Sequence, residues 1–112
     1  MHFCLTGQYT PQAVKSLMEN PSSNRYEAAK QMIEAAGGKL IAMYGMPAEG
    51  PGVLVIFDVP EPGTAAAAIS GVVIAAGVLH NVKVLRLLTM DEVMHTRQLA
   101  GKVRASYRPP GH

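Results

Sequence analysis

Apolar and polar residues alternate along residues 2–9, as they do in a strand whose two faces differ. Three later segments are rich in β-branched and apolar residues and are flanked by turn-forming residues, which is typical of strands. These segments are residues 39–45, 52–59 and 79–88. Residues 46–51 favour a turn, so the second and third strands should form a hairpin.

Capping residues and three- and four-residue spacings predict helices between the strands. Thr10 before Pro11 is typical of a helix start, and Pro21 interrupts that helix because proline lacks the amide donor. Asn24 and Glu27 have the spacing of a capping box at the start of the next helix. We predict helices over residues 11–18, 24–36, 64–77 and 90–104.

The segment 64–77 consists almost wholly of Ala, Val, Ile, Gly and Ser. It is too short for a membrane span of about 20 residues, so we predict a buried helix. Gly71 in its middle costs about 1 kcal/mol relative to Ala unless another backbone approaches closely there. We therefore expect this helix to pack against the sheet and against a neighbouring element.

The last predicted helix opens with a capping box formed by Thr89 and Glu92. Beyond it, residues 106–112 contain Pro109-Pro110 and are expected to be a mobile tail. Residues 1–105 are then a single α+β domain, as expected for a chain of 112 residues.

The order of elements predicts a ferredoxin-like βαββαβ fold with an extra C-terminal helix. In this fold the two crossover helices cover one face of a four-stranded antiparallel sheet and leave the other face open. Residues 53–57 are apolar without polar alternation, so this strand is expected to be buried on both sides. We therefore predict a homodimer or higher homo-oligomer in which the open sheet faces of two chains pack together.

Composition excludes several classes of protein. Hydrophobic residues make up 48% and charged residues 16%, which is unlike a disordered chain. The net charge of +2 is not concentrated in a run of Lys or Arg, so we predict no nucleic-acid partner and no membrane partner. The single Cys4 excludes an intrachain disulfide and no leader sequence is recognisable, so we expect a cytoplasmic protein.

Three stretches of the chain resemble the GYD-domain family of small bacterial proteins, a branch of the dimeric α/β-barrel group. They are Gln8-Tyr9-Thr10, residues 25–38 with Glu-Ala-Ala-Lys and Ala-Gly-Gly-Lys, and Leu85-Arg86 followed by Thr89, Asp91 and Glu92. The resemblance covers about residues 3–95 and implies a ferredoxin-like dimeric α/β barrel. It departs from the family at residues 49–53, which read Glu-Gly-Pro-Gly-Val where the Gly-Tyr-Asp tripeptide is expected.

No pair of histidines has the spacing of metal ligands on one helix face or on neighbouring strand positions, so we predict no metal site and no cofactor. The four histidines are His2, His80, His95 and His112. His80 stands at the start of the last strand, where its imidazole is either an acid or base or a strand-end group bonded to the backbone. Cys4 lies in mid-strand without an activating base, so we interpret it as a small buried hydrophobe.

The parity of the last strand places Arg86 on the same side as His80. Arg86 is either an anchor for a carboxylate or phosphate, or one half of a salt bridge to Asp91, Glu92 or a partner chain. Thr6 and Gln8 are expected on the open face, where they either line a pocket or only keep that face polar.

Tyr9 and Tyr44 have hydroxyl groups that either polarise a substrate or lie at the rim of the core. Thr6, Gln8 and Arg86, placed on one face by strand alternation, would supply a hydroxyl, an amide and a cation. This combination of groups suits a small anionic or carbonyl-bearing ligand. The predicted ligand-binding residues are Thr6, Gln8, Tyr44, His80 and Arg86.

No catalytic motif is present in the sequence. We therefore predict a homo-oligomer that binds a small molecule, either between the sheet and its helices or between subunits. Two alternatives stay open. One is a cofactor-independent monooxygenase or isomerase, because the resemblance implies a wider barrel group that includes cofactor-independent monooxygenases, haem-degrading enzymes, lactone isomerases and ligand-sensing domains. The other is a structural assembly subunit without a ligand.

Overall fold

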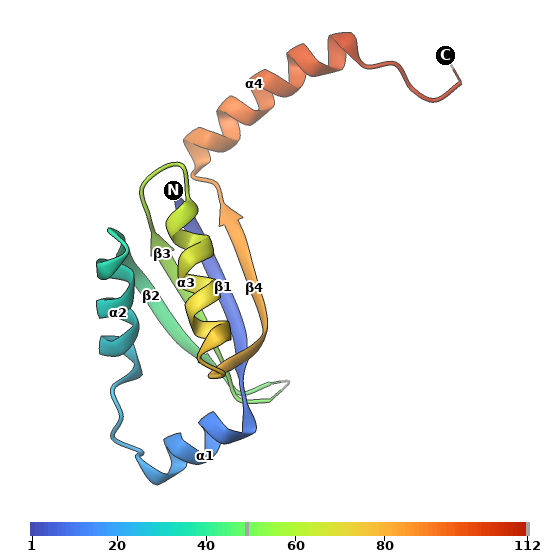
Figure 1. Cartoon of the computed structure of the whole chain (residues 1–112). Coiled ribbons are helices and arrows are strands. Elements are labelled where there is room, and N and C mark those ends of the chain that lie inside the picture. The colour runs from blue at the N-terminus through green and yellow to red at the C-terminus, as the bar shows by residue number, and fades with distance from the viewer. Residues whose placement is uncertain (49, 112) are drawn as a thin grey trace.

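The computed structural model describes residues 1–48 and 50–111 and has, within them, one four-stranded antiparallel sheet and four helices (Figure 1). The sheet order is β2-β3-β1-β4, which confirms the ferredoxin-like topology. The strands are β1 (His2–Tyr9), β2 (Lys39–Met46), β3 (Gly52–Asp58) and β4 (Leu79–Leu87). The helices are α1 (Pro11–Glu19), α2 (Arg25–Ala35), α3 (Thr64–Ala75) and α4 (Met90–Ser106).

The helix starts follow the predicted capping residues. The Thr10 hydroxyl accepts a hydrogen bond from the amide of Ala13, and the Asn24 side chain accepts one from the amide of Glu27. Thr89 and Glu92 form the complete capping box at the start of α4. Every described element begins and ends within two residues of its predicted limits. Within the predicted tail, His112 lies outside the described residues, and the mobility of the tail stays a prediction.

The core lies between one face of the sheet and helices α2 and α3, which Figure 1 shows on the same side of the sheet. Phe57 of β3 is fully buried, and its ring stacks on Phe3 of β1 at a centroid distance of 6.0 Å. Ile33 of α2 and Ile69 of α3 pack against the same face of the sheet and are also buried. Burial of this apolar face is the main stabilising contribution to the domain.

None of the described helices covers the opposite face of the sheet, which we call the open face. On this face, four apolar residues, one from each strand, lie side by side in a row across the sheet. The row is Ala42, Ile56, Cys4 and Leu85. Leu85 is 53% exposed and Tyr44, in the adjacent row, is 63% exposed. The expectation that the second face lacks a helical cover is therefore confirmed for the described chain.

The prediction that α3 is buried is only partly right. Ala66 and Ile69 are buried against the sheet, but Val72 and Ile74 are more than half exposed. A Cβ atom added at Gly71 would meet no described atom within 4 Å. One layer of sheet accepts one side of a helix, so the outer side of α3 stays exposed in the single chain.

Helix α4 projects away from the rest of the molecule (Figure 1). The Cα radius of gyration is 18.0 Å, whereas a compact domain of this length has about 13 Å. None of the residues of α4 is buried. None of the described helices is both long and apolar enough to span a bilayer.

Replacement of Phe57 by Ala should destabilise the domain by about 3–5 kcal/mol, because it leaves a cavity and removes the stacking on Phe3. Urea denaturation measures this change. Met18→Ala is the control, since Met18 is 75% exposed and its loss should change the free energy of unfolding by about 0.5 kcal/mol or less. Equal effects of the two substitutions would contradict the core described above.

Candidate functional site

Four of the predicted ligand-binding residues lie on the open face, in two adjacent rows. Thr6 pairs with Leu54, which in turn pairs with Tyr44. Gln8 and His80 are direct neighbours across β1 and β4. The structure therefore places Thr6, Gln8, Tyr44 and His80 on one side of the sheet, which agrees with the open-face prediction for Thr6 and Gln8. Their role in binding a ligand stays a prediction.

A β-bulge at Asn81 reverses the orientation of the later residues of β4. Asn81 has a φ of 51°, in the left-handed region that Asn tolerates better than most residues. Its side-chain amide donates a hydrogen bond of 2.8 Å to the Gln8 side chain. The register between β1 and β4 shifts here, so that Lys83 rather than Val82 lies opposite Thr6. Residues after the bulge consequently face the side opposite to that predicted by simple alternation.

The prediction that Arg86 shares the open face with Thr6 and Gln8 is therefore wrong. Arg86 pairs with Phe3 on the helix side, where its guanidinium lies 5.8 Å from the centroid of the Phe3 ring. It forms an ion pair of 2.5 Å with Glu92 and donates to the carbonyl oxygen of Leu87. The alternative of a salt bridge to Glu92 is confirmed, and the cation beside Thr6 is Lys83.

One end of the open face is hollowed into a groove of about 720 Å³. Thr6, Gln8 and Lys83 line it together with the described part of the β2–β3 turn, of which Glu49 lies outside the described residues. Tyr44 and His80 are not among its lining residues. The groove brings a hydroxyl, an amide and an ammonium group together, but it has no enclosing wall in the single chain.

A second hollow lies between α2, α3 and the sheet, which is one of the two places that the sequence suggested for a ligand, although its lining residues were not predicted. This apolar slot has a volume of about 200 Å³. Leu5, Val55 and Phe57 of the sheet form its floor, while Met32 of α2 and Val73 of α3 form its walls. Such a cavity suits the apolar part of a small molecule.

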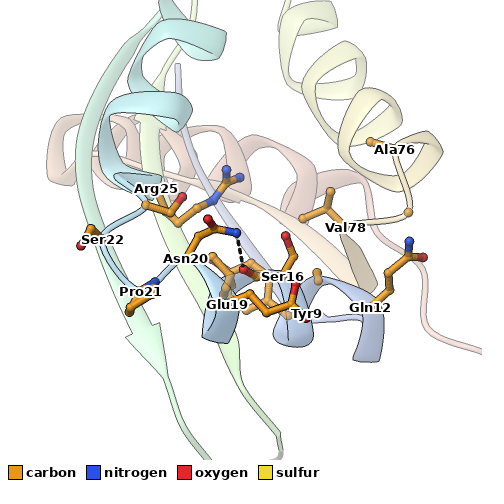
Figure 2. Close-up of a pocket in the computed structure, with 14 residues that line it drawn as sticks. Tyr9, Gln12, Ser16, Glu19, Asn20, Pro21, Ser22, Arg25, Ala76 and Val78 are labelled. Atoms are coloured by element: carbon orange, nitrogen blue, oxygen red, sulfur yellow. Dashed lines mark hydrogen bonds between the residues drawn. The ribbon is translucent and has the colours of Figure 1, made fainter.

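The apolar slot continues into a polar groove of about 780 Å³, which α1, the linker from α1 to α2 and the end of α3 enclose (Figure 2). Tyr9, Arg25, Ala76 and Val78 line both hollows, so they stand where slot and groove meet. Gln12, Ser16 and Asn20 add polar groups to the groove, and the Asn20 amide donates to the carbonyl oxygen of Ser16 (Figure 2). Together the two hollows form a site with an apolar interior and a polar mouth.

The sequence gives only weak indications that Tyr9 and Arg25 line a site. Tyr9 shares the parity of Phe3 and Leu5, so it belongs to the helix side, and the prediction of its ring against the core is confirmed. Arg25 is the first residue of α2, directly after the cap residue Asn24. Nothing in the sequence shows that α2 and α3 leave a gap between them.

Other titratable groups do not form a metal or nucleophile site among the described residues. No group of three or more His, Cys, Asp and Glu residues is placed to hold a metal ion in the described chain. His2 lies on β1 and His95 on α4, while His112 is outside the described residues. Cys4 is buried, as predicted, and burial raises the pKa of its thiol, which disfavours the nucleophilic thiolate.

Lowering the pH should loosen the start of α4. Hydrogen bonds from the backbone amide of Thr89 and from Arg86 lower the pKa of the Glu92 carboxyl from 4.5 to about 2. The stabilisation is complete above pH 4.5 and is lost as the pH falls through about 2. Far-UV circular dichroism should therefore show helix loss in this window.

Glu92→Gln keeps a capping-box acceptor but removes the titrating charge, so this helix loss should largely disappear in the variant. The matched control is Glu27→Gln in the first turn of α2. If Glu92→Gln and the wild type lose helix over the same pH range, the ion pair with Arg86 does not hold α4.

Comparisons with known proteins agree with the topology. A comparison with curated protein sequences gives no significant match. The sequence model of the GYD domain family matches residues 3–96, which is most of the 112-residue chain. With this match and the ferredoxin-like sheet described above, the chain belongs to the GYD domain family.

Proposed function

We propose that the protein is a homo-oligomer that binds a small organic molecule, with the apolar part of the ligand in the slot between α2 and α3. The observation that carries the proposal is the apolar slot itself, which opens into a polar mouth at Tyr9 and Arg25. An apolar cavity with a few convergent polar groups is the usual form of a small-molecule site. The volume of about 200 Å³ favours a compact ligand.

The polar mouth favours an anionic or carbonyl-bearing head group. The guanidinium of Arg25 offers a bidentate fork that matches a carboxylate, and the Tyr9 hydroxyl is a further hydrogen-bond donor. Both side chains line the slot as well as the groove. A ligand whose head group binds at the mouth can therefore keep its apolar part inside the slot. Arg25 thus takes the anchoring role that the sequence alone suggested for Arg86.

The homo-oligomer is supported by the open face. None of the described helices covers the apolar row of Ala42, Ile56, Cys4 and Leu85. Leu85 is 53% exposed, and Ala42 and Ile56 are partly exposed although Cys4 between them is buried, and a monomer of this size seldom leaves such a row in water. We propose that a second copy covers it, sheet against sheet. In that arrangement the groove at Thr6 and Gln8 lies beside the interface, where Tyr44 and His80 of the same face complete a second binding surface. The buried free thiol of Cys4 fits a reducing compartment such as the cytoplasm.

Octanoate is a suitable probe, because it combines a compact apolar chain with a carboxylate. Arg25→Ala should weaken octanoate binding about tenfold or more in calorimetric titration, since a hydrogen bond to a charged group contributes about 1.5–3 kcal/mol. Octanol, which lacks the charge, should bind the wild type and the variant alike. Lys30→Ala is the matched control, because it removes a cation from α2 that does not line the slot.

Ala29→Leu tests the slot independently of charge. Ala29 lines the slot and is half-buried, so a leucine there should fill the cavity and abolish binding of both probes while the chain still unfolds cooperatively. Mass spectrometry of the natively purified protein would identify the physiological ligand. Equal octanoate affinities of the wild type, Arg25→Ala and Ala29→Leu would reject the site and favour a structural assembly subunit.

Leu85→Lys should convert the oligomer into smaller species in sedimentation equilibrium, because it puts a charge into the apolar row of the open face. Leu85 is 53% exposed in the single chain, so the domain itself should tolerate the change. Met18→Lys on α1 is the control. A wild-type protein that sediments as a monomer at micromolar concentration would refute the sheet-to-sheet contact.

A further inference from the structure

Helix α1 borders the mouth of the proposed ligand site but is weakly packed. It has nine residues and none of them is buried. Helices this short are marginal in water unless an apolar side is covered. By contrast, α2 and α3 on the other sides of the site bury Ile33 and Ile69 against the sheet. Segments with few buried apolar contacts are the ones that open locally, and lids over ligand sites are drawn from them.

The start of α1 is tied to the segment that follows α3. The Thr10 amide donates a hydrogen bond of 3.0 Å to the carbonyl oxygen of Val78, and the Thr10 hydroxyl donates one of 2.8 Å to that of Gly77. Gly77 and Val78 both line the polar groove. Thr10 therefore fixes one end of α1 at the rim of the mouth.

The far end of α1 has only local hydrogen bonds among the described residues. The backbone amide and the side-chain amide of Asn20 both donate to the carbonyl oxygen of Ser16, one turn back in α1. In the linker, the amide of Ser23 donates to the carbonyl oxygen of Asn20, and Pro21 has no amide hydrogen to donate. Residues 20–24 are exposed throughout. This end of α1 is thus free to move while Thr10 acts as a pivot.

The side of α1 that faces the groove is apolar. Ala13 and Leu17 are four residues apart, so they lie together on the helix surface, and both line the groove. They are only half-buried. Ala76 and Val78 line the same groove from the end of α3 and also line the slot (Figure 2). Apolar surface therefore faces apolar surface across a groove of about 780 Å³, and an inward movement of α1 would cover both.

We propose that α1 is the closing wall of the ligand site. When a ligand occupies the slot, α1 turns about Thr10 and places Leu17 and Ala13 on the part of the ligand next to its head group. This inference rests on the proposed function, since the ligand is the one held by the slot and its mouth. Closure covers the apolar surface on both sides of the groove and removes water from around Arg25.

Closure also affects which ligands bind. Opposite charges attract more strongly where water is excluded, so the contact between the Arg25 guanidinium and an anionic head group is strengthened in the closed site. Leu17 is then a specificity-determining residue, because it favours ligands whose apolar part reaches the mouth.

Hydrogen exchange followed by mass spectrometry tests the closure. Octanoate at about ten times its Kd should slow exchange of the α1 amides about tenfold, because each opening of α1 then requires release of the ligand. Exchange in α4, residues 90–106, should stay the same, which makes this helix the internal control. Octanoate that binds without slowing exchange in α1 would overturn the closure and leave the slot in place, whereas a wild type that does not bind octanoate would reject both.

Two neighbouring residues of α1 provide a matched pair of variants. Leu17→Ser should weaken octanoate binding about tenfold in calorimetric titration, because it removes an apolar side chain that closure buries. Octanol should lose the same factor, since this contact involves no charge, unlike the loss expected for Arg25→Ala. Met18→Ser makes a comparable change where the side chain is 75% exposed, and it should leave both affinities unchanged. Equal octanoate affinities of Leu17→Ser and Met18→Ser would overturn the role of Leu17.

Thr10 is a positioning residue, and its variants separate closure from helix stability. Thr10→Val removes the cap of α1 and the bond to Gly77, so exchange in ligand-free α1 should rise about fivefold and the octanoate affinity should fall by a similar factor. Thr10→Ser keeps the hydroxyl and should restore both. Faster exchange in Thr10→Val with an unchanged octanoate affinity would show that α1 takes no part in the site, and would refute the proposal.

Discussion

The bulge at Asn81 decides how β4 presents its side chains, and much of the molecule depends on it. Gln8 holds the left-handed Asn81 through a side-chain hydrogen bond, and from there on each residue of β4 faces the side that alternation would give to its neighbour. Lys83 is thereby delivered to the open face and Arg86 to the helix side. Without this single extra residue, the cation that pairs with Glu92 would lie on the wrong side of the sheet.

Arg86 then links parts of the molecule that are otherwise separate. Its guanidinium lies over the Phe3 ring, which stacks on Phe57 in the core, and it pairs with Glu92 in the first turn of α4. Glu92 is at the same time the capping residue of α4. The core, the edge strand and the projecting helix are thus joined through one side chain. The polar mouth of the proposed small-molecule site, at Arg25 and Tyr9, is at the other end of α3. The slot behind it shares Phe57 with this network but is not lined by Phe3, Arg86 or Glu92.

Much of the fold follows from local signals in the sequence. Thr10-Pro11, Asn24 with Glu27, and Thr89 with Glu92 satisfy free amide groups within one turn, so their effect is independent of the rest of the chain. The strand limits follow equally from apolar content and turn residues. The side on which Arg86 lies could not be predicted, because the bulge depends on a contact between Gln8 and Asn81, which are far apart in the sequence.

The site was harder to predict than the fold for the same reason. Tyr9 of β1 and Arg25 of α2 line the same slot only through the tertiary packing of α2 and α3 on the sheet, and no pattern within either helix records the gap between them. The apolar composition of α3 suggested burial on all sides, but composition does not tell burial within a chain from burial between chains. Ala66 and Val72 look alike in sequence, yet one is buried and the other exposed.

The joint at Glu92 gives α4 the properties of a lever. At 1.5 Å per residue its 17 residues extend about 25 Å from a fulcrum formed by one ion pair and one capping box. A tilt of about 10° at the fulcrum would carry the far end about 4 Å, roughly the height of one side chain. Small adjustments of a few atoms around Phe3 and Arg86 are therefore magnified into movements large enough to make or break contacts at the distal turns.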